Sequence, residues 1–192
     1  MQDLLYNIKQ CTICNDYLPL GPRPVVSAHP NSKIVIIGQA PGTKVYASGI
    51  PWDDASGKQL RNWLNVSPET FYNSEKFAII PMGFCYPGKG KSGDLPPRQE
   101  CAPQWHKSLF ENMSNVELVL LIGMYAQKYY LGKESKKTLT DTVANFQEYL
   151  PKYLPLPHPS PRNRFWLIKN PWFEVEVLPK LRERTKRIIS IT

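Results

Sequence analysis

Residues 33–42 read Lys-Ile-Val-Ile-Ile-Gly-Gln-Ala-Pro-Gly, in which four β-branched residues run into a turn with a glycine at each end. An apolar run of this length and composition predicts a strand buried on both faces, as in a parallel sheet covered by helices. Ligands of such sheets bind beyond the carboxyl ends of the strands. The Gly38–Gly42 turn is therefore a candidate binding loop.

The rest of the chain alternates between strand and helix patterns. Strands are predicted over residues 76–81, 116–122 and 153–156, and helices over residues 57–64, 98–113, 125–130 and 170–189. Prolines interrupt the last strand, which places it at an edge of the sheet. This alternation predicts an α/β fold, a three-layer α/β/α sandwich around a central, mainly parallel four-stranded sheet.

The length of 192 residues, with 42% hydrophobic and 21% charged residues, predicts a single globular domain over residues 1–192. The longest apolar runs, 33–38 and 116–123, are too short to cross a bilayer. The first residues lack the layout of a secretory signal. We therefore expect a cytoplasmic protein with no membrane partner.

The formal net charge is +8, which favours a polyanionic partner, nucleic acid first, through neutralisation of phosphates. Lys89 and Lys91 lie in a stretch rich in glycine and proline, and Arg162 follows a His-Pro-Ser sequence. A further basic cluster, residues 182–187, is equally well explained as the solvated face of a helix.

The four cysteines are Cys11, Cys14, Cys85 and Cys101, and the first two form a CxxC motif. Thiols stay reduced in a cytoplasmic chain, so a metal site is favoured over disulfides and over four unrelated buried cysteines. A CxxC motif places two sulfurs close enough to share one metal ion or cluster. Zinc and a 4Fe–4S cluster both accept four cysteines. The last pair, sixteen positions apart, lacks the second CxxC of a zinc ribbon.

Two motifs resemble the active-site motifs of uracil-DNA glycosylases: Gly38–Gly42 after a buried strand, and His158-Pro159-Ser160 after the last strand. The chain is most similar to the iron–sulfur branch of that superfamily, families four and five, whose cysteines have the same layout. The segment Gly49-Ile50-Pro51-Trp52 is similar to the Gly-x-Pro-Phe segment of that branch. Several short motifs in the right order and spacing are more specific than any one of them.

The resemblance implies a monomeric, monofunctional DNA glycosylase of base-excision repair. Such an enzyme flips a damaged nucleotide out of DNA and hydrolyses the N-glycosidic bond of uracil or a related deaminated base. It implies catalytic roles for Gln39 and His158. The implied base-pocket residues are Gly38, Ala40, Pro41, Gly42 and Trp52. The implied DNA contacts are Ser160, Arg162, Lys89 and Lys91. The four cysteines would hold a structural 4Fe–4S cluster, with zinc as the less favoured occupant.

The sequence also departs from the family pattern. Gln39 stands where family four has a glutamate, and an amide can orient a water molecule but cannot take its proton. Pro81 stands where an asparagine would read uracil, and proline has neither an amide side chain nor an N–H donor. The nearest carboxylates, Asp53 and Asp54, are equally well explained as the cap of a helix.

These departures leave two other interpretations open. The first is a catalytically inactive, nucleic-acid-binding member of the same fold, which the altered Gln39 and Pro81 positions favour. The second is a zinc-stabilised α/β hydrolase unrelated to DNA.

Overall fold

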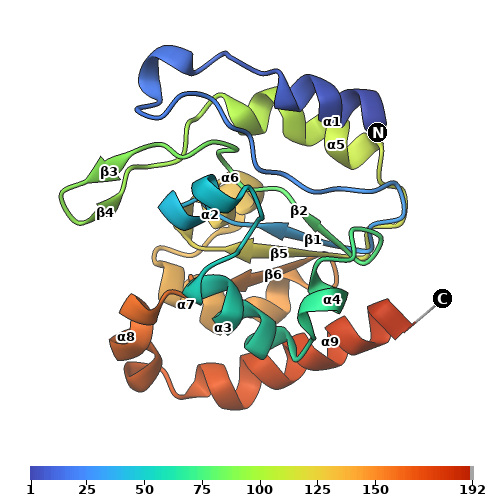
Figure 1. The fold of residues 1–192 in the computed structure, drawn as a ribbon. Coiled ribbons are helices and arrows are strands. Elements are labelled where there is room, and N and C mark those ends of the chain that lie inside the picture. Colours follow the sequence, from blue (N-terminus) through green and yellow to red (C-terminus); the bar gives the residue numbers. More distant parts are fainter. Residues whose placement is uncertain (191–192) are drawn as a thin grey trace.

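A four-stranded sheet forms the centre of the computed structural model, which describes residues 1–190 (Figure 1). Its strands are β1 (Ile34–Ile37), β2 (Phe77–Ile79), β5 (Leu118–Ile122) and β6 (Tyr153–Leu156). They lie in the order β2-β1-β5-β6, and all three neighbouring pairs are parallel. The four predicted strands and the edge position of residues 153–156 are confirmed.

The apolar run of β1 is continuous because both faces of the sheet are covered. Ile34 and Ile36 pack into one core cluster with Leu60, whereas Val35 and Ile37 pack into a second cluster with Leu109. Successive side chains of a strand point to opposite faces. A strand without any polar position therefore fits only the middle layer of a sandwich.

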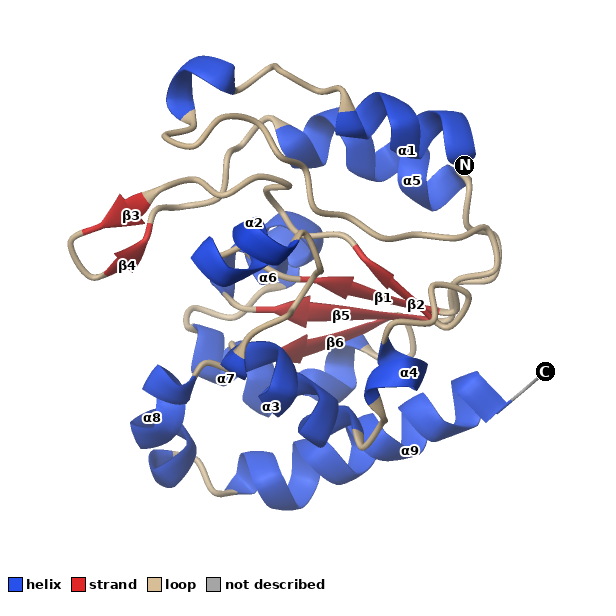
Figure 2. Cartoon of the chain, viewed as in Figure 1, coloured by secondary structure: helices blue, strands red, loops and turns tan. Residues whose placement is uncertain are grey.

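Helices cover the two faces of the sheet (Figure 2). One face packs against α3 (Ala55–Leu64), α4 (Pro68–Phe71), α7 (Leu139–Ala144) and α9 (Leu178–Ser190). The other face packs against α1 (Gln2–Lys9), α5 (Lys107–Glu111) and α6 (Met124–Leu131). The predicted three-layer α/β/α sandwich is confirmed. No helix among residues 1–190 is both long enough and apolar enough to cross a membrane.

Two predicted helices begin later than the sequence pattern indicated. The helix predicted over 98–113 has a π-helical first part, Ala102–His106, and continues as α5. Pro103 fits only the first turn of a helix, which moves the start to Cys101. The helix predicted over 170–189 is π-helical over Phe173–Val177 before α9 begins. Pro179 has no N–H for the carbonyl of Val175, and a wider turn precedes it.

Some elements had no predicted counterpart. They are α1, α2 (Thr43–Ser48), α4, α7, α8 (Arg164–Lys169) and a hairpin of β3 (Lys89–Gly90) and β4 (Gly93–Asp94). The hairpin falls in the stretch rich in glycine and proline around Lys89 and Lys91, for which no strand was predicted. The hairpin stands away from the sandwich, beyond the carboxyl ends of the strands (Figure 1).

The basic cluster at residues 182–187 contributes to the fold. Arg182 donates from Nε to the carbonyl of Trp63 at 3.1 Å and from Nη2 to that of Asn62 at 3.4 Å. Arg184 donates to the carbonyl of Pro151 at 2.9 Å. These two arginines thus hold α9 against the end of α3 and the loop before β6, which favours a structural role for them.

Candidate active site

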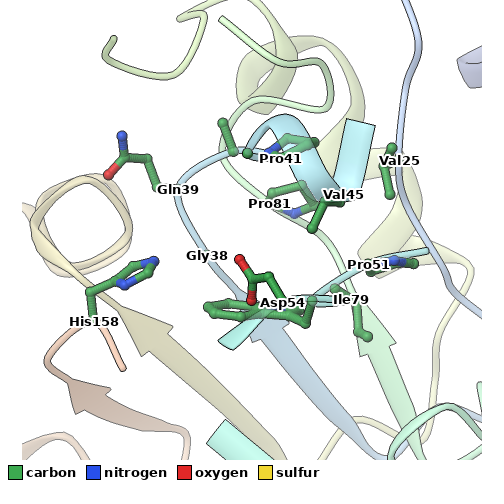
Figure 3. Close-up of a pocket in the computed structure, with 13 residues that line it drawn as sticks. Val25, Gly38, Gln39, Pro41, Val45, Pro51, Asp54, Ile79, Pro81 and His158 are labelled. Carbon is green, nitrogen blue, oxygen red and sulfur yellow. The ribbon is translucent and has the colours of Figure 1, made fainter. Parts of the chain in front are cut away.

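A pocket lies beyond the carboxyl end of β1, with an empty volume of about 440 Å³ that is partly open to solvent (Figure 3). The Gly38–Gly42 loop forms one side of it. Trp52, which precedes α3, and His158, which follows β6, also line the pocket. Residues far apart in the sequence meet here because the carboxyl ends of parallel strands share one edge of the sheet.

The ring of Trp52 lies directly against the backbone of Gly38. A Cβ atom added to Gly38 would lie 2.8 Å from Cζ2 of Trp52, closer than van der Waals contact allows. The ring also lies beside His158, with ring centroids 5.6 Å apart and planes tilted by 31°. Glycine at position 38 is therefore what allows a large aromatic ring to reach the floor of the pocket.

The backbone of Trp52 is held in an unusual conformation. Its φ of 57° is left-handed, a region that costs energy for a bulky residue. Arg61 Nη1 and the Tyr72 hydroxyl both donate to the carbonyl of Trp52, each at 3.4 Å. A Cβ atom on Gly57 would lie only 1.7 Å from the same carbonyl oxygen. These contacts fix the position of the Trp52 backbone.

Asp54 caps α3 and lines the pocket. Its Oδ1 accepts a hydrogen bond from the Gly57 N–H at 2.8 Å, so the predicted cap is confirmed for Asp54. Burial lowers the pKa of His158 below its ordinary value of 6.5, and the nearby charge of Asp54 partly offsets that effect. Asp53 is exposed and does not line the pocket.

The amide of Gln39 points away from Asp54 (Figure 3). Its Nε2 donates to the carbonyl of Leu95, just after the hairpin, at 3.3 Å. Gln39 thus lines the pocket while its amide is directed toward the hairpin side. The side chain connects the Gly38–Gly42 loop to the hairpin.

Pro81, at the end of β2, forms an apolar part of the pocket wall. Its carbonyl accepts a hydrogen bond from Nε2 of His106 at 3.1 Å. A carbonyl oxygen can only accept, so Nε2 carries the proton, and Nδ1 accepts from the Tyr130 hydroxyl at 2.6 Å. His106 is 2% exposed, and burial lowers its pKa to about 4.

His106 makes the stability of the fold sensitive to acid. The unfolded chain binds a proton at this residue near pH 6.5, whereas the folded chain does so only near pH 4. The contribution of the neutral His106 to the free energy of unfolding is therefore fully present above pH 6.5. It is lost as the pH falls toward 4, by about 3 kcal/mol in total. We expect His106→Gln to lower stability at neutral pH and to reduce this pH dependence, as measured by urea unfolding at several pH values. If the stability of the variant fell equally steeply with falling pH, His106 would not be the source of the acid sensitivity.

A wider groove adjoins the pocket and shares Gln39, Gly42, Asp54 and His158 with it. Lys44 and Lys89 line this groove together with Ser160 and Arg162. Arg162 reaches the hairpin, since a Cβ atom on Gly93 would lie 3.2 Å from its Nη1. The Ser160 hydroxyl accepts from the Arg162 N–H at 3.2 Å. Lys91 lies in the turn between the hairpin strands and does not line the groove.

The four predicted cysteine ligands, Cys11, Cys14, Cys85 and Cys101, line one cavity with Phe84, Arg98 and Trp105. None of them forms a disulfide, and all except Cys11 are buried. Burial raises the pKa of Cys85 to about 11 and that of Cys101 to about 12. Within residues 1–190, no group of three or more His, Cys, Asp or Glu side chains is arranged so that it could hold a metal ion.

Several residues of the site have no signal in the sequence. Val25, Val45 and Ile79 line the pocket, and apolar side chains of this kind resemble any other core residue. Arg61 and Tyr72 act through hydrogen bonds to a backbone carbonyl, which follow no sequence spacing. The position of Arg61 and Tyr72 beside the carbonyl of Trp52 could be found only in the folded chain.

Fold and site together define an α/β protein with a pocket lined by Trp52 and His158 that adjoins a groove lined by lysine and arginine side chains. Over residues 26–182 the chain matches the family model of the Uracil DNA glycosylase superfamily. The match covers most of the 192 residues and includes Gly38–Gly42, Trp52 and His158. The chain therefore belongs to the uracil-DNA glycosylase superfamily, whose members are DNA glycosylases.

Proposed function

We propose that this protein is a monofunctional DNA glycosylase that removes uracil or a related deaminated base, acting as a cytoplasmic monomer. The observation that supports this most is the meeting of Trp52, His158 and Asp54 at one pocket in a chain of this superfamily. A flipped base would stack on the Trp52 ring. The base would then lie within reach of His158, while Asp54 would face the sugar.

In the proposed reaction, the departing base takes the electron pair of the N-glycosidic bond, and the sugar gains positive charge. The imidazole of His158 donates a hydrogen bond to the base carbonyl that becomes negative. A neutral imidazole carries one such N–H, and the lowered pKa of His158 favours this neutral form. His158 therefore needs no extra proton to stabilise the leaving base.

We assign to Asp54 the activation of the attacking water. Its carboxylate stabilises the positive charge on the sugar and accepts a proton as the water oxygen bonds to the anomeric carbon. The proton then passes to solvent, and the released base is protonated on the nitrogen that left. Gln39 is an amide turned toward Leu95, so it is less suited to this role.

The groove would hold the DNA strand on both sides of the flipped nucleotide. Lys44 and Lys89 line it, together with Ser160 and Arg162 of the segment after β6. Side chains of these types bind phosphate oxygens without reading sequence. Lys91, in the hairpin turn, would add a phosphate contact beyond the groove.

The proposal is tested by incubating excess protein with oligonucleotides that contain uracil, hypoxanthine or xanthine, single-stranded and paired. Alkali converts each abasic site into a strand break. We expect breaks with wild type and about 100-fold slower excision with His158→Ala, because one donor to the developing anion is lost.

His29→Ala is the matched control, since His29 lies in the loop before β1 and lines neither the pocket nor the groove. It should excise bases at the wild-type rate. The alternative of a catalytically inactive, nucleic-acid-binding member is favoured by Gln39 and Pro81. Binding of the oligonucleotides without any excision would support that alternative and contradict the glycosylase.

We further propose that Cys11, Cys14, Cys85 and Cys101 hold a 4Fe–4S cluster, as in the iron–sulfur branch that the chain resembles. The four thiols share one largely buried cavity, and thiolates are the ligands that such clusters require. A cluster is larger than a single ion, so its ligands can stand further apart than those of zinc. The group would supply structure, joining the N-terminal segment to the segment between Cys85 and Cys101.

A Cys101→Ala variant tests this assignment. We expect wild-type protein purified without oxygen to contain iron and acid-labile sulfide and to be coloured, and the variant to lose most of both. The variant should also unfold at lower denaturant concentration, because the N-terminal segment is no longer fastened. Zinc without sulfide in the wild type would assign the site to zinc, and the absence of both would contradict a metal site.

A further inference from the structure

Most of the residues that line the candidate base pocket have apolar side chains. The residues that line it with apolar side chains are Val25, Ala40, Pro41, Val45, Pro51, Ile79 and Pro81, together with the largely apolar Trp52 (Figure 3). Three of these are prolines, which have no backbone N–H to offer a ligand. A base in the pocket would meet mainly surfaces that select by shape.

The wall at Pro81 is apolar in its backbone as well. Pro81 has no N–H, and its carbonyl is already bonded to Nε2 of His106. Because His106 is buried and in turn bonded to Tyr130, this carbonyl is held on the side away from the pocket. The residue at this position therefore presents neither a donor nor an acceptor to a bound base.

The polar side chains of the pocket have other partners or other tasks. The Gln39 amide donates to Leu95, and Asp54 caps α3 through one of its carboxylate oxygens. His158 and the remaining oxygen of Asp54 serve the reaction in the function proposed above. Apart from the indole N–H of Trp52, the only side-chain groups left to meet the hydrogen-bonding edge of a base belong to the Gln39 amide, which is held toward Leu95.

A pocket that hydrogen-bonds its ligand and a pocket with apolar walls discriminate between ligands to very different degrees. A site built to hydrogen-bond a substrate group rejects analogues that lack the group by about 10⁴-fold or more, whereas an apolar pocket separates similar ligands by roughly 10- to 200-fold. The difference arises because a reading site leaves its own buried polar groups unpaired when the wrong ligand binds.

We infer that this pocket selects a base by its shape and by how readily it leaves as an anion, and does not read its Watson–Crick edge. The substrates are then a class: flat pyrimidine bases whose glycosidic nitrogen is acidic, with or without the 4-oxygen and the N3 proton of uracil. Normal bases in duplex DNA are protected by the cost of extruding a paired nucleotide. This inference rests on the proposed glycosylase function.

The inference is tested with single-stranded oligonucleotides, which remove differences in base pairing between substrates. Three bases are compared under excess enzyme: uracil, 5-fluorouracil, and pyrimidin-2-one, which lacks the 4-oxygen and the N3 proton. We expect 5-fluorouracil to be removed faster than uracil, because fluorine makes the leaving nitrogen more acidic. Pyrimidin-2-one should be removed within about 100-fold of uracil.

Two substitutions of Pro81 sharpen the comparison. Pro81→Asn places an amide at the wall, where it can form two hydrogen bonds with the N3–H and the 4-oxygen of uracil but only one with the bare N3 of pyrimidin-2-one. We expect the ratio of uracil to pyrimidin-2-one rates to rise at least about tenfold in this variant. Pro81→Ala introduces the same backbone N–H as Pro81→Asn but no side-chain amide, and should leave the ratio within a few-fold of wild type.

The outcomes separate the two proposals. Excision of uracil with a preference of about 10⁴-fold over pyrimidin-2-one would overturn the inference and leave the glycosylase standing. Excision of hypoxanthine or xanthine but of none of these three pyrimidines would also overturn the inference, whereas excision of no base at all would contradict the proposed function itself. Should Pro81→Asn fail to fold, the wild-type ratio alone decides, because it is measured without any substitution.

Discussion

A Gly57→Ala variant is expected to lose base excision by about 10³-fold. The new Cβ atom would lie 1.7 Å from the carbonyl oxygen of Trp52, so either that carbonyl or α3 must move by more than 1 Å. A displacement of about 1 Å at a reacting group can cost about 100-fold in rate. Here two groups move together, because Gly57 also donates its N–H to Asp54. A single methyl group thus displaces both the stacking ring and the carboxylate.

Lys58→Ala is the control for this variant, since Lys58 is the next residue of α3 and is exposed. Alanine is a better helix former than either glycine or lysine, so helix propensity alone predicts no loss in either variant. Single-turnover excision and thermal unfolding should be measured for both. Excision by Gly57→Ala within a few-fold of wild type would show that the position of Trp52 is not constrained in the way described.

A second variant serves if Gly57→Ala does not fold. Tyr72→Phe removes one of the two donors to the Trp52 carbonyl and adds no atom. Arg61 then remains as the single donor, so we expect a loss of several-fold in excision with little change in stability. Removal of the hydroxyl without any effect on rate would mean that Arg61 and packing hold the left-handed conformation of Trp52 without the Tyr72 hydroxyl.

The central sheet could be predicted because its strands carry an unambiguous signal. Each residue of Ile34–Ile37 is buried, and only a strand in the middle layer of a sandwich has no polar position. The short elements gave no such signal. Helix α2 buries only Val45, and the hairpin consists of two residue pairs, so neither has an apolar periodicity that a sequence could display.

The meeting of the Gly38–Gly42 loop and His158 at one site could also be predicted, since both follow parallel strands. The hydrogen bonds that support the site from behind could not be predicted. His106 bonds to Pro81 across 25 positions of sequence, and nothing in the sequence near either residue indicates this pairing. The choice between Asp53 and Asp54 was equally hidden. Only the folded chain shows that Asp54 lines the pocket and that Asp53 does not.

Asp54→Asn is expected to slow excision by about 10³-fold, within the range of about 10²- to 10⁴-fold that general acid–base catalysis contributes. Asparagine has the same shape as aspartate and caps a helix about equally well. Its side-chain oxygen can still accept from the Gly57 N–H, so α3 should begin at the same residue. The substitution removes only the negative charge and the ability to accept a proton from water.

Asp53→Asn is a close control, because it changes the adjacent carboxylate, which is exposed and lies outside the pocket. We expect it to excise bases at the wild-type rate, and both variants to unfold at the wild-type temperature. The loss of charge in Asp54→Asn should also lower the pKa of His158 further, since Asp54 raises that pKa in the wild type. Titration of the His158 ring by NMR would measure this shift independently of activity. If Asp54→Asn retained excision within about fivefold of wild type while the pKa of His158 fell, Asp54 would be a neighbour of the reaction and not its base, because general-base catalysis contributes at least about 100-fold.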